Sequence, residues 1–167
     1  MPADKEKSPL CKLMLAVMMR GSRRYPSVVE INRHLDEFYG ATVTWRTNSV
    51  GGRHVFRISC EMINNRYRFA GDNQNILRGV AEIVLNVLLD PMLDENGLLC
   101  AQNIESEKKI AIDAIQAKIN DQKAYSAEQC HKYMLGDDAS GISSSGTIEQ
   151  IEGFTAEELT ANIAYFL

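Results

Sequence analysis

The chain has 167 residues, a length typical of one globular domain. Hydrophobic residues make up 45% and charged residues 24%, which excludes a disordered tail, a collagen-like repeat and a small disulfide-rich fold. The net charge of −4 provides no basic field, so we expect no nucleic-acid partner. The four cysteines lack the two-residue spacing of a zinc knuckle or a redox dithiol, which indicates reduced thiols in a cytoplasmic protein.

Targeting and membrane-spanning segments are not apparent in the sequence. The apolar run Leu13–Met19 is far shorter than the roughly 20 residues that cross a bilayer. The charges that precede it are of mixed sign, and no small-residue cleavage site follows, so a signal peptide is not predicted. We therefore expect no membrane partner.

The first part of the chain is predicted to form two helices and a β-hairpin. Apolar residues recur at helical spacing over 8–20 and over 27–39, and Gly21 is expected to end the first of these helices. The period then changes to two over 41–48 and over 53–63, with a Gly-Gly pair between the two segments. This pattern predicts an antiparallel hairpin.

The rest of the chain is predicted to be helical. Apolar periodicity indicates a helix over 73–90, one long helix or two in series over 94–122, and another over 126–135. The segment 136–146 lacks the lysine of a phosphate loop and the second glycine of a nucleophile elbow, so an ordinary surface loop is expected. Thr155 is placed to cap a last helix.

Histidines are the first candidates for a metal site. His34, His54 and His131 have no second histidine or cysteine four residues away. Cys130 adjoins His131, but neighbouring residues on a helix face apart and make a poor chelate. The sequence therefore predicts no metal ion bound through these residues.

Two clusters of charge have simple interpretations. Arg20, Arg23, Arg24 and Arg33 form a local basic cluster suited to an anionic partner surface. The acidic residues Glu105, Glu107 and Asp113 alternate with lysines and are expected to form a solvated helix face.

An ordered series of short motifs is more informative than any single residue. It comprises Arg20-Gly21-Ser22, Tyr25-Pro26, Tyr39-Gly40-Ala41, Asp90-Pro91, Ser106-Glu107-Lys108, Gly146-Thr147-Ile148-Glu149-Gln150-Ile151 and Thr155-Ala156-Glu157-Glu158-Leu159. Over nearly the whole chain this order resembles the insulinase/pitrilysin family of zinc peptidases, the inverzincins. Within the family it is most similar to bacterial members that have lost the active site and occur beside an active paralogue. The resemblance implies an α+β fold, in which helices pack on a mixed or antiparallel sheet.

The resemblance also shows where catalytic residues would stand on the first helix. Active members carry His-x-x-Glu-His there, so that two histidines on one helix face bind zinc and the glutamate activates a water molecule. The second histidine falls five residues before the glycine that is Gly21 here, which places the three positions at Lys12, Leu15 and Ala16. None of these side chains can act as a zinc ligand or general base.

A third zinc ligand would come from the long helix, seven residues after a first glutamate. If Glu107 is that first glutamate, the ligand position is Ala114, which has no ligand atom. Asp113 is adjacent but points about 100° away around the helix. The resemblance therefore implies no catalytic residue, no metal ligand and no cofactor, with zinc expected in active relatives only.

The family's domain begins with a strand before the first helix and continues with further strands after the last. We therefore expect residues 1–167 to be a single incomplete domain. Its expected function is that of an inactive, peptidase-like subunit that pairs with an active paralogue or with itself and contacts extended peptide. Two alternatives stay open: a fragment of an active zinc metallopeptidase with its chemistry elsewhere, and an oligomeric scaffold that binds no peptide.

Overall fold

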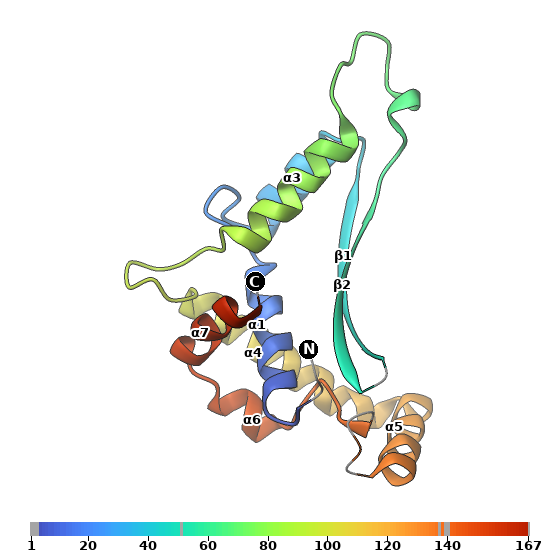
Figure 1. Cartoon of the computed structure of the whole chain (residues 1–167), viewed down its shortest axis with the longest axis vertical. Helices are drawn as coiled ribbons and strands as arrows, with labels where there is room; N and C mark the ends of the chain where they lie inside the picture. The colour runs from blue at the N-terminus through green and yellow to red at the C-terminus, as the bar shows by residue number, and fades with distance from the viewer. Residues whose placement is uncertain (1–3, 51, 137, 139–140, 167) are drawn as a thin grey trace.

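The computed structural model describes residues 4–50, 52–136, 138 and 141–166. These residues form an α+β fold, in which seven α-helices accompany one two-stranded antiparallel sheet (Figure 1). No helix in these ranges is long and apolar enough to cross a bilayer. The elements are α1 (Lys7–Met18), α2 (Val28–Asp36), β1 (Thr42–Val50), β2 (Arg53–Glu61), α3 (Ile76–Leu89), α4 (Ala101–Ala117), α5 (Gln122–Leu135), α6 (Ile148–Gly153) and α7 (Ala156–Phe166).

The first helix is the centre of one hydrophobic core. It packs against α4, α6 and α7, and most of its side chains are buried because apolar residues occupy nearly every position from 13 to 18. The buried members of this core are Leu13, Met14, Val17, Met18, Leu99, Ile104, Ile151 and Leu159. A helix enclosed in this way is held by packing on several sides.

Gly21 does not end α1 by a left-handed conformation, contrary to the expectation from sequence. The helix ends at Met18, and Gly21 is absent from the residues with positive φ. A Cβ atom at Gly21 would lie 2.9 Å from the carbonyl carbon and oxygen of Pro26. The glycine is therefore required because two backbone segments approach each other closely.

A second hydrophobic core joins α2 to α3. Its buried members are Tyr25, Ile31, Leu35, Ala41, Ile76, Val80, Ile83 and Val87, and the half-buried Val43 of β1 packs against them. On the opposite side of α3, Leu77, Leu85 and Leu89 are between 51% and 65% exposed, beside the exposed Arg78–Glu82 ion pair. Helix α3 is therefore apolar on more of its surface than this chain covers.

The hairpin runs along one side of the molecule in Figure 1. Its register pairs Trp45 with Ile58 and Thr47 with Phe56, so these half-buried side chains share one face of the sheet. Arg46 and Arg57 lie opposite each other on the other, exposed face. Among the described residues neither strand has a second partner. Gly51 of the predicted turn lies outside them.

The long helix begins later than predicted. Residues 94–98 form a turn in which Asp94 Oδ1 accepts hydrogen bonds from the backbone N–H groups of Asn96 at 2.8 Å and Leu98 at 2.9 Å. An isolated bridge then pairs Leu93 with Leu99, so α4 starts only at Ala101. The Asp side chain competes with helix formation by bonding to nearby backbone groups.

Helix α6 was not predicted. It is six residues long, which is too short for an apolar period to be recognised. Its start is well defined by a capping box, in which Thr147 Oγ1 accepts from the Gln150 N–H at 3.3 Å and Gln150 Oε1 accepts from the Thr147 N–H at 3.0 Å.

Candidate functional site

Three positions at which the resemblance places the zinc ligands of active relatives line a single cavity. Lys12 and Ala16 of α1 face Ala114 of α4 across a space of about 260 Å³, and Glu107 also lines it. We call this space the α1–α4 cavity. Most of its wall is apolar and includes Leu13, Trp45, Ile110, Ala111, Ile115 and Ile151. Leu15, at the position of the general base, is fully buried and does not line the cavity.

The ammonium group of Lys12 is half-buried in this cavity. Its Nζ atom donates a hydrogen bond to Ser145 Oγ at 3.2 Å. Burial lowers the pKa of Lys12 below 10.5, and the like charge of Lys118 lowers it further, whereas Glu128 acts in the opposite direction. A positive side chain therefore stands at a position where the resemblance leads us to expect a metal ligand in active relatives.

Glu107 is not part of a solvated face, contrary to the expectation from sequence. Its side chain is only 12% exposed and forms an ion pair with Arg20, which follows α1. Arg20 is therefore committed to an internal ion pair and is not free to meet a partner surface. Among the described residues that line the cavity, Glu107 is the one with a carboxylate side chain.

The described residues contain no group of three or more His, Cys, Asp and Glu side chains that could hold a metal ion. His34 contacts Glu37, with 3.4 Å between Nδ1 and Oε2, and packs edge-on against Tyr25. The side chain of His54 lies outside the described part of the chain. All four cysteines are free. That the protein binds no zinc stays a prediction.

The segment that ends at Gly146 is more than an ordinary surface loop. Ser145 contributes the hydroxyl that binds Lys12, and Gly146 lies against the start of α1. Gly146 has a φ of +69°, and a Cβ atom there would lie 2.7 Å from the Cβ atom of Pro9. Sequence reasoning missed Ser145 as a site residue. The motif that starts at Gly146 was the available signal, because it marks a segment with a defined position in the fold.

A second cavity adjoins the α1–α4 cavity beneath the hairpin. This second cavity of about 210 Å³ shares Ala16, Trp45 and Glu107 with the first, and continues between α2, α3 and Val43 of β1. The half-buried face of β1 therefore borders two adjoining hollows. Trp45 lines both of them.

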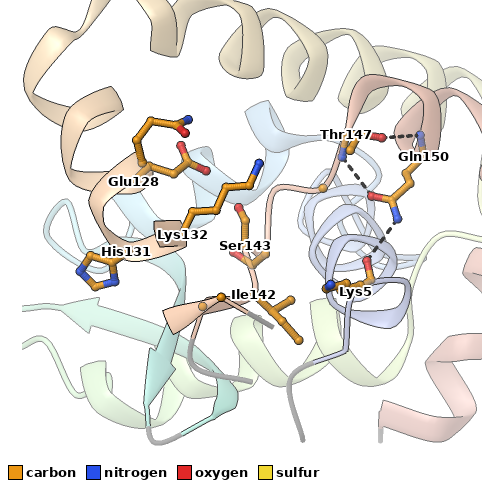
Figure 2. A pocket seen from close by; sticks show the side chains of 13 residues that line it. Lys5, Glu128, His131, Lys132, Ile142, Ser143, Thr147 and Gln150 are labelled. Carbon is orange, nitrogen blue, oxygen red and sulfur yellow. Dashed lines mark hydrogen bonds between the residues drawn. The ribbon is translucent and has the colours of Figure 1, made fainter. Parts of the chain in front are cut away.

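A larger cavity of about 610 Å³ lies on the other side of the 143–146 segment (Figure 2). Glu128, His131 and Lys132 reach it from α5, and on the facing side Gln150 donates a hydrogen bond to the carbonyl oxygen of Lys5 at 3.2 Å. Lys12, Leu15, Ala16 and Ala114, the four positions singled out by the resemblance, do not line this cavity. Its wall adjoins residues outside the described ranges, and we assign it no role.

Comparison with known proteins supports the resemblance read from the motifs. No family model matches this chain. Over 158 residues it is 27% identical to "Probable inactive metalloprotease YmfF" of Bacillus subtilis (strain 168), a match that covers 95% of this chain and 36% of that protein. The resemblance to the insulinase/pitrilysin family is confirmed.

Solved structures show the same fold. A conserved protein from Enterococcus faecalis V583 matches with a TM-score of 0.85 at 22% identity, over 99% of this chain and 38% of that one. Pitrilysin matches with a TM-score of 0.60 at 14% identity, over 94% of this chain and 14% of its own. This insulinase-like chain thus spans little more than a third of the length of the first two relatives.

Proposed function

We propose that this chain is part of a catalytically inactive, peptidase-like protein that acts as a non-catalytic partner of an active zinc peptidase and contacts extended peptide. One observation carries the loss of catalysis. Lys12, Ala16 and Ala114, which stand where the resemblance leads us to expect the three zinc ligands, line one cavity and have no zinc-binding group. This supports a site that has the cavity without the ligands.

A direct test of inactivity measures zinc and hydrolysis. We expect the purified chain to retain no stoichiometric zinc after dialysis, because Lys12 places a positive charge in the cavity and Glu107 is paired with Arg20. Elemental analysis and a quenched fluorogenic peptide measure the two properties. About one zinc per chain that resists dialysis would show that a different set of ligands exists.

A gain-of-binding variant tests whether the cavity corresponds to the family's metal site. The triple variant Lys12→His, Ala16→His and Ala114→Glu restores three ligands, and we expect it to bind zinc. The control places the carboxylate at Ala117, which is exposed and does not line the cavity, in place of Ala114. If the folded triple variant binds zinc no better than this control, the correspondence is wrong.

The partner role is supported by uncovered apolar surface. The exposed leucines of α3 form an apolar stripe, and within the described residues both strands of the hairpin keep a free edge. Such surfaces are covered by further chain or by another protein. We propose that another insulinase-like domain covers α3, since the relatives carry much more chain than this segment matches.

Peptide contact is proposed at the free edge of the hairpin. An extended peptide adds to a sheet edge through main-chain hydrogen bonds, largely independently of its side chains. We expect a fluorescently labelled, extended decapeptide to bind, and the same peptide with alternate backbone nitrogens methylated to bind at least about tenfold more weakly. Equal binding of the two peptides, or none, would favour the scaffold alternative.

A second candidate function rests on the length of the match. This chain covers 36% of the Bacillus subtilis relative, a length that also fits a fragment of an active metallopeptidase whose ligands lie elsewhere. The complete reading frame separates the two proposals. His-x-x-Glu-His within the same frame supports the fragment, whereas His-x-x-Glu-His in an adjacent gene supports the inactive partner.

A further inference from the structure

The α1–α4 cavity has the size and surface of a site for a small apolar group. Its volume is about 260 Å³, and apolar side chains such as Leu13, Trp45, Ile115 and Ile151 form most of the wall. An apolar cavity of about 150 Å³ is already large enough to bind benzene. An aromatic ring or a branched alkyl group would therefore fit beside Trp45.

The charges around this cavity do not balance. Arg20 is paired with Glu107, and Lys118 is paired with Glu128, whose two carboxylate oxygens lie 3.1 and 2.9 Å from the lysine Nζ atom. Within the described residues Lys12 makes no ion pair, and its Nζ atom bonds to the neutral hydroxyl of Ser145. One positive charge is left in excess.

An ammonium group in an apolar cavity is stabilised by an anion that enters with it. Leaving such a charge half-buried without a counter-ion costs free energy, and a carboxylate that pairs with it removes that cost. The hydroxyl of Ser145 is a second donor beside Lys12, because it can donate its own hydrogen while it accepts one from the lysine.

We propose that the α1–α4 cavity binds a carboxylate attached to a single apolar group. Lys12 Nζ and Ser145 Oγ would hold the carboxylate, and the apolar group would pack against the wall around Trp45. The chemistry is the same for a free organic acid and for the C-terminal residue of a peptide. This proposal goes beyond the proposed function and does not depend on a partner or on the hairpin edge.

The single tryptophan of the chain is the reporter for this proposal. Trp45 lines the cavity, so a bound ligand changes its fluorescence without a label. Two pairs of probes distinguish the sources: 3-phenylpropanoate against 3-phenylpropanamide, and a tetrapeptide ending in Phe with a free against an amidated C-terminus. We expect the charged member of at least one pair to bind at least about tenfold more tightly than its neutral counterpart.

Variants separate the charge from the shape of the site. Lys12→Met removes the charge with a side chain of similar length, and we expect it to weaken binding of the charged probe about tenfold or more. Lys109→Met is the control, because Lys109 is exposed and does not line the cavity. Ala114→Phe leaves Lys12 in place but fills the cavity from α4, and it should also abolish binding.

The binding measurements on folded variants decide whether the proposal holds. Circular dichroism verifies that each variant is folded, and calorimetry measures binding independently of Trp45. Binding of the free acid alone assigns the site to small molecules, and binding of the peptide carboxylate assigns it to a protein terminus; both support the proposal. It is overturned if no charged probe binds the wild-type chain at millimolar concentration, or if folded Lys12→Met and Ala114→Phe bind as tightly as wild type.

Discussion

Truncation of Met14 should destabilise the chain strongly, since this side chain lies at the centre of the α1 core. Met14 is 0% exposed and belongs to the cluster in which α1 meets α4, α6 and α7. Its neighbours Leu15 and Met18 are equally enclosed, and the amide nitrogen of Asn162 lies 3.8 Å from the Met14 sulfur. The surroundings have little freedom to collapse into the space that Met14→Ala would leave.

The size of the effect follows from that enclosure. Replacing a buried methionine by alanine costs about 2–5 kcal/mol, and a site that cannot relax lies in the upper part of this range, at about 3.5–5 kcal/mol. For a chain of this length the corresponding fall in melting temperature is about 7–20 °C. Such a loss is a large fraction of the total stability of a typical domain.

Urea and thermal denaturation followed by circular dichroism measure this prediction. Met134→Ala is the matched control, because the same substitution is made on a side chain that is 77% exposed. We expect the control to change the free energy of unfolding by no more than about 0.5 kcal/mol. The assignment of α1 to the core would be refuted by a Met14→Ala midpoint equal to that of wild type, or by an equal loss in the control.

Three further predictions concern the site and its surroundings. Gly146→Ala should lower the free energy of unfolding by about 1–3 kcal/mol, because the residue has a φ of +69° and its new Cβ atom would meet Pro9. Gly153→Ala is the control: it has open space around it and should be near neutral in the same denaturation assay. Lys12→Met should raise the free energy of unfolding at pH 7. The folded-state pKa of Lys12 lies below 10.5, so the charged side chain destabilises the folded chain at pH 7. The stability gained by the substitution should shrink as the pH rises toward 10.5, where wild-type Lys12 loses its charge. A gain that does not depend on pH would mean that lost charge is not its cause. Size-exclusion chromatography with light scattering should show self-association that weakens when Leu77 and Leu89 are replaced by Gln; a clean monomer that binds no apolar dye would contradict the open α3 surface.

Local pattern was sufficient to place three helices and the hairpin. Helices α1, α2 and α3 and the β1–β2 hairpin lie where apolar period and turn residues predicted them, because each is long enough to show several repeats of its period. The predicted start of α4 was wrong, and α6 was not predicted. Asp94 and Thr147 control these boundaries by side-chain bonds to the backbone, which apolar periodicity does not register.

The absence of zinc-ligand side chains is a property of residue type, and the sequence alone determines it at Lys12, Ala16 and Ala114 once the family's spacing is applied. The surroundings of those positions were decided by the tertiary structure. Lys12 bonds to Ser145, which is 133 residues away in sequence, and Arg20 pairs with Glu107, which is 87 residues away. Periodicity shows that one face of a helix is apolar, but which distant segment covers that face depends on how the helices pack together. The cavity, with the ammonium group of Lys12 and the carboxylate of Glu107 in its wall, exists only because α1, α4 and the segment before α6 come together in the fold.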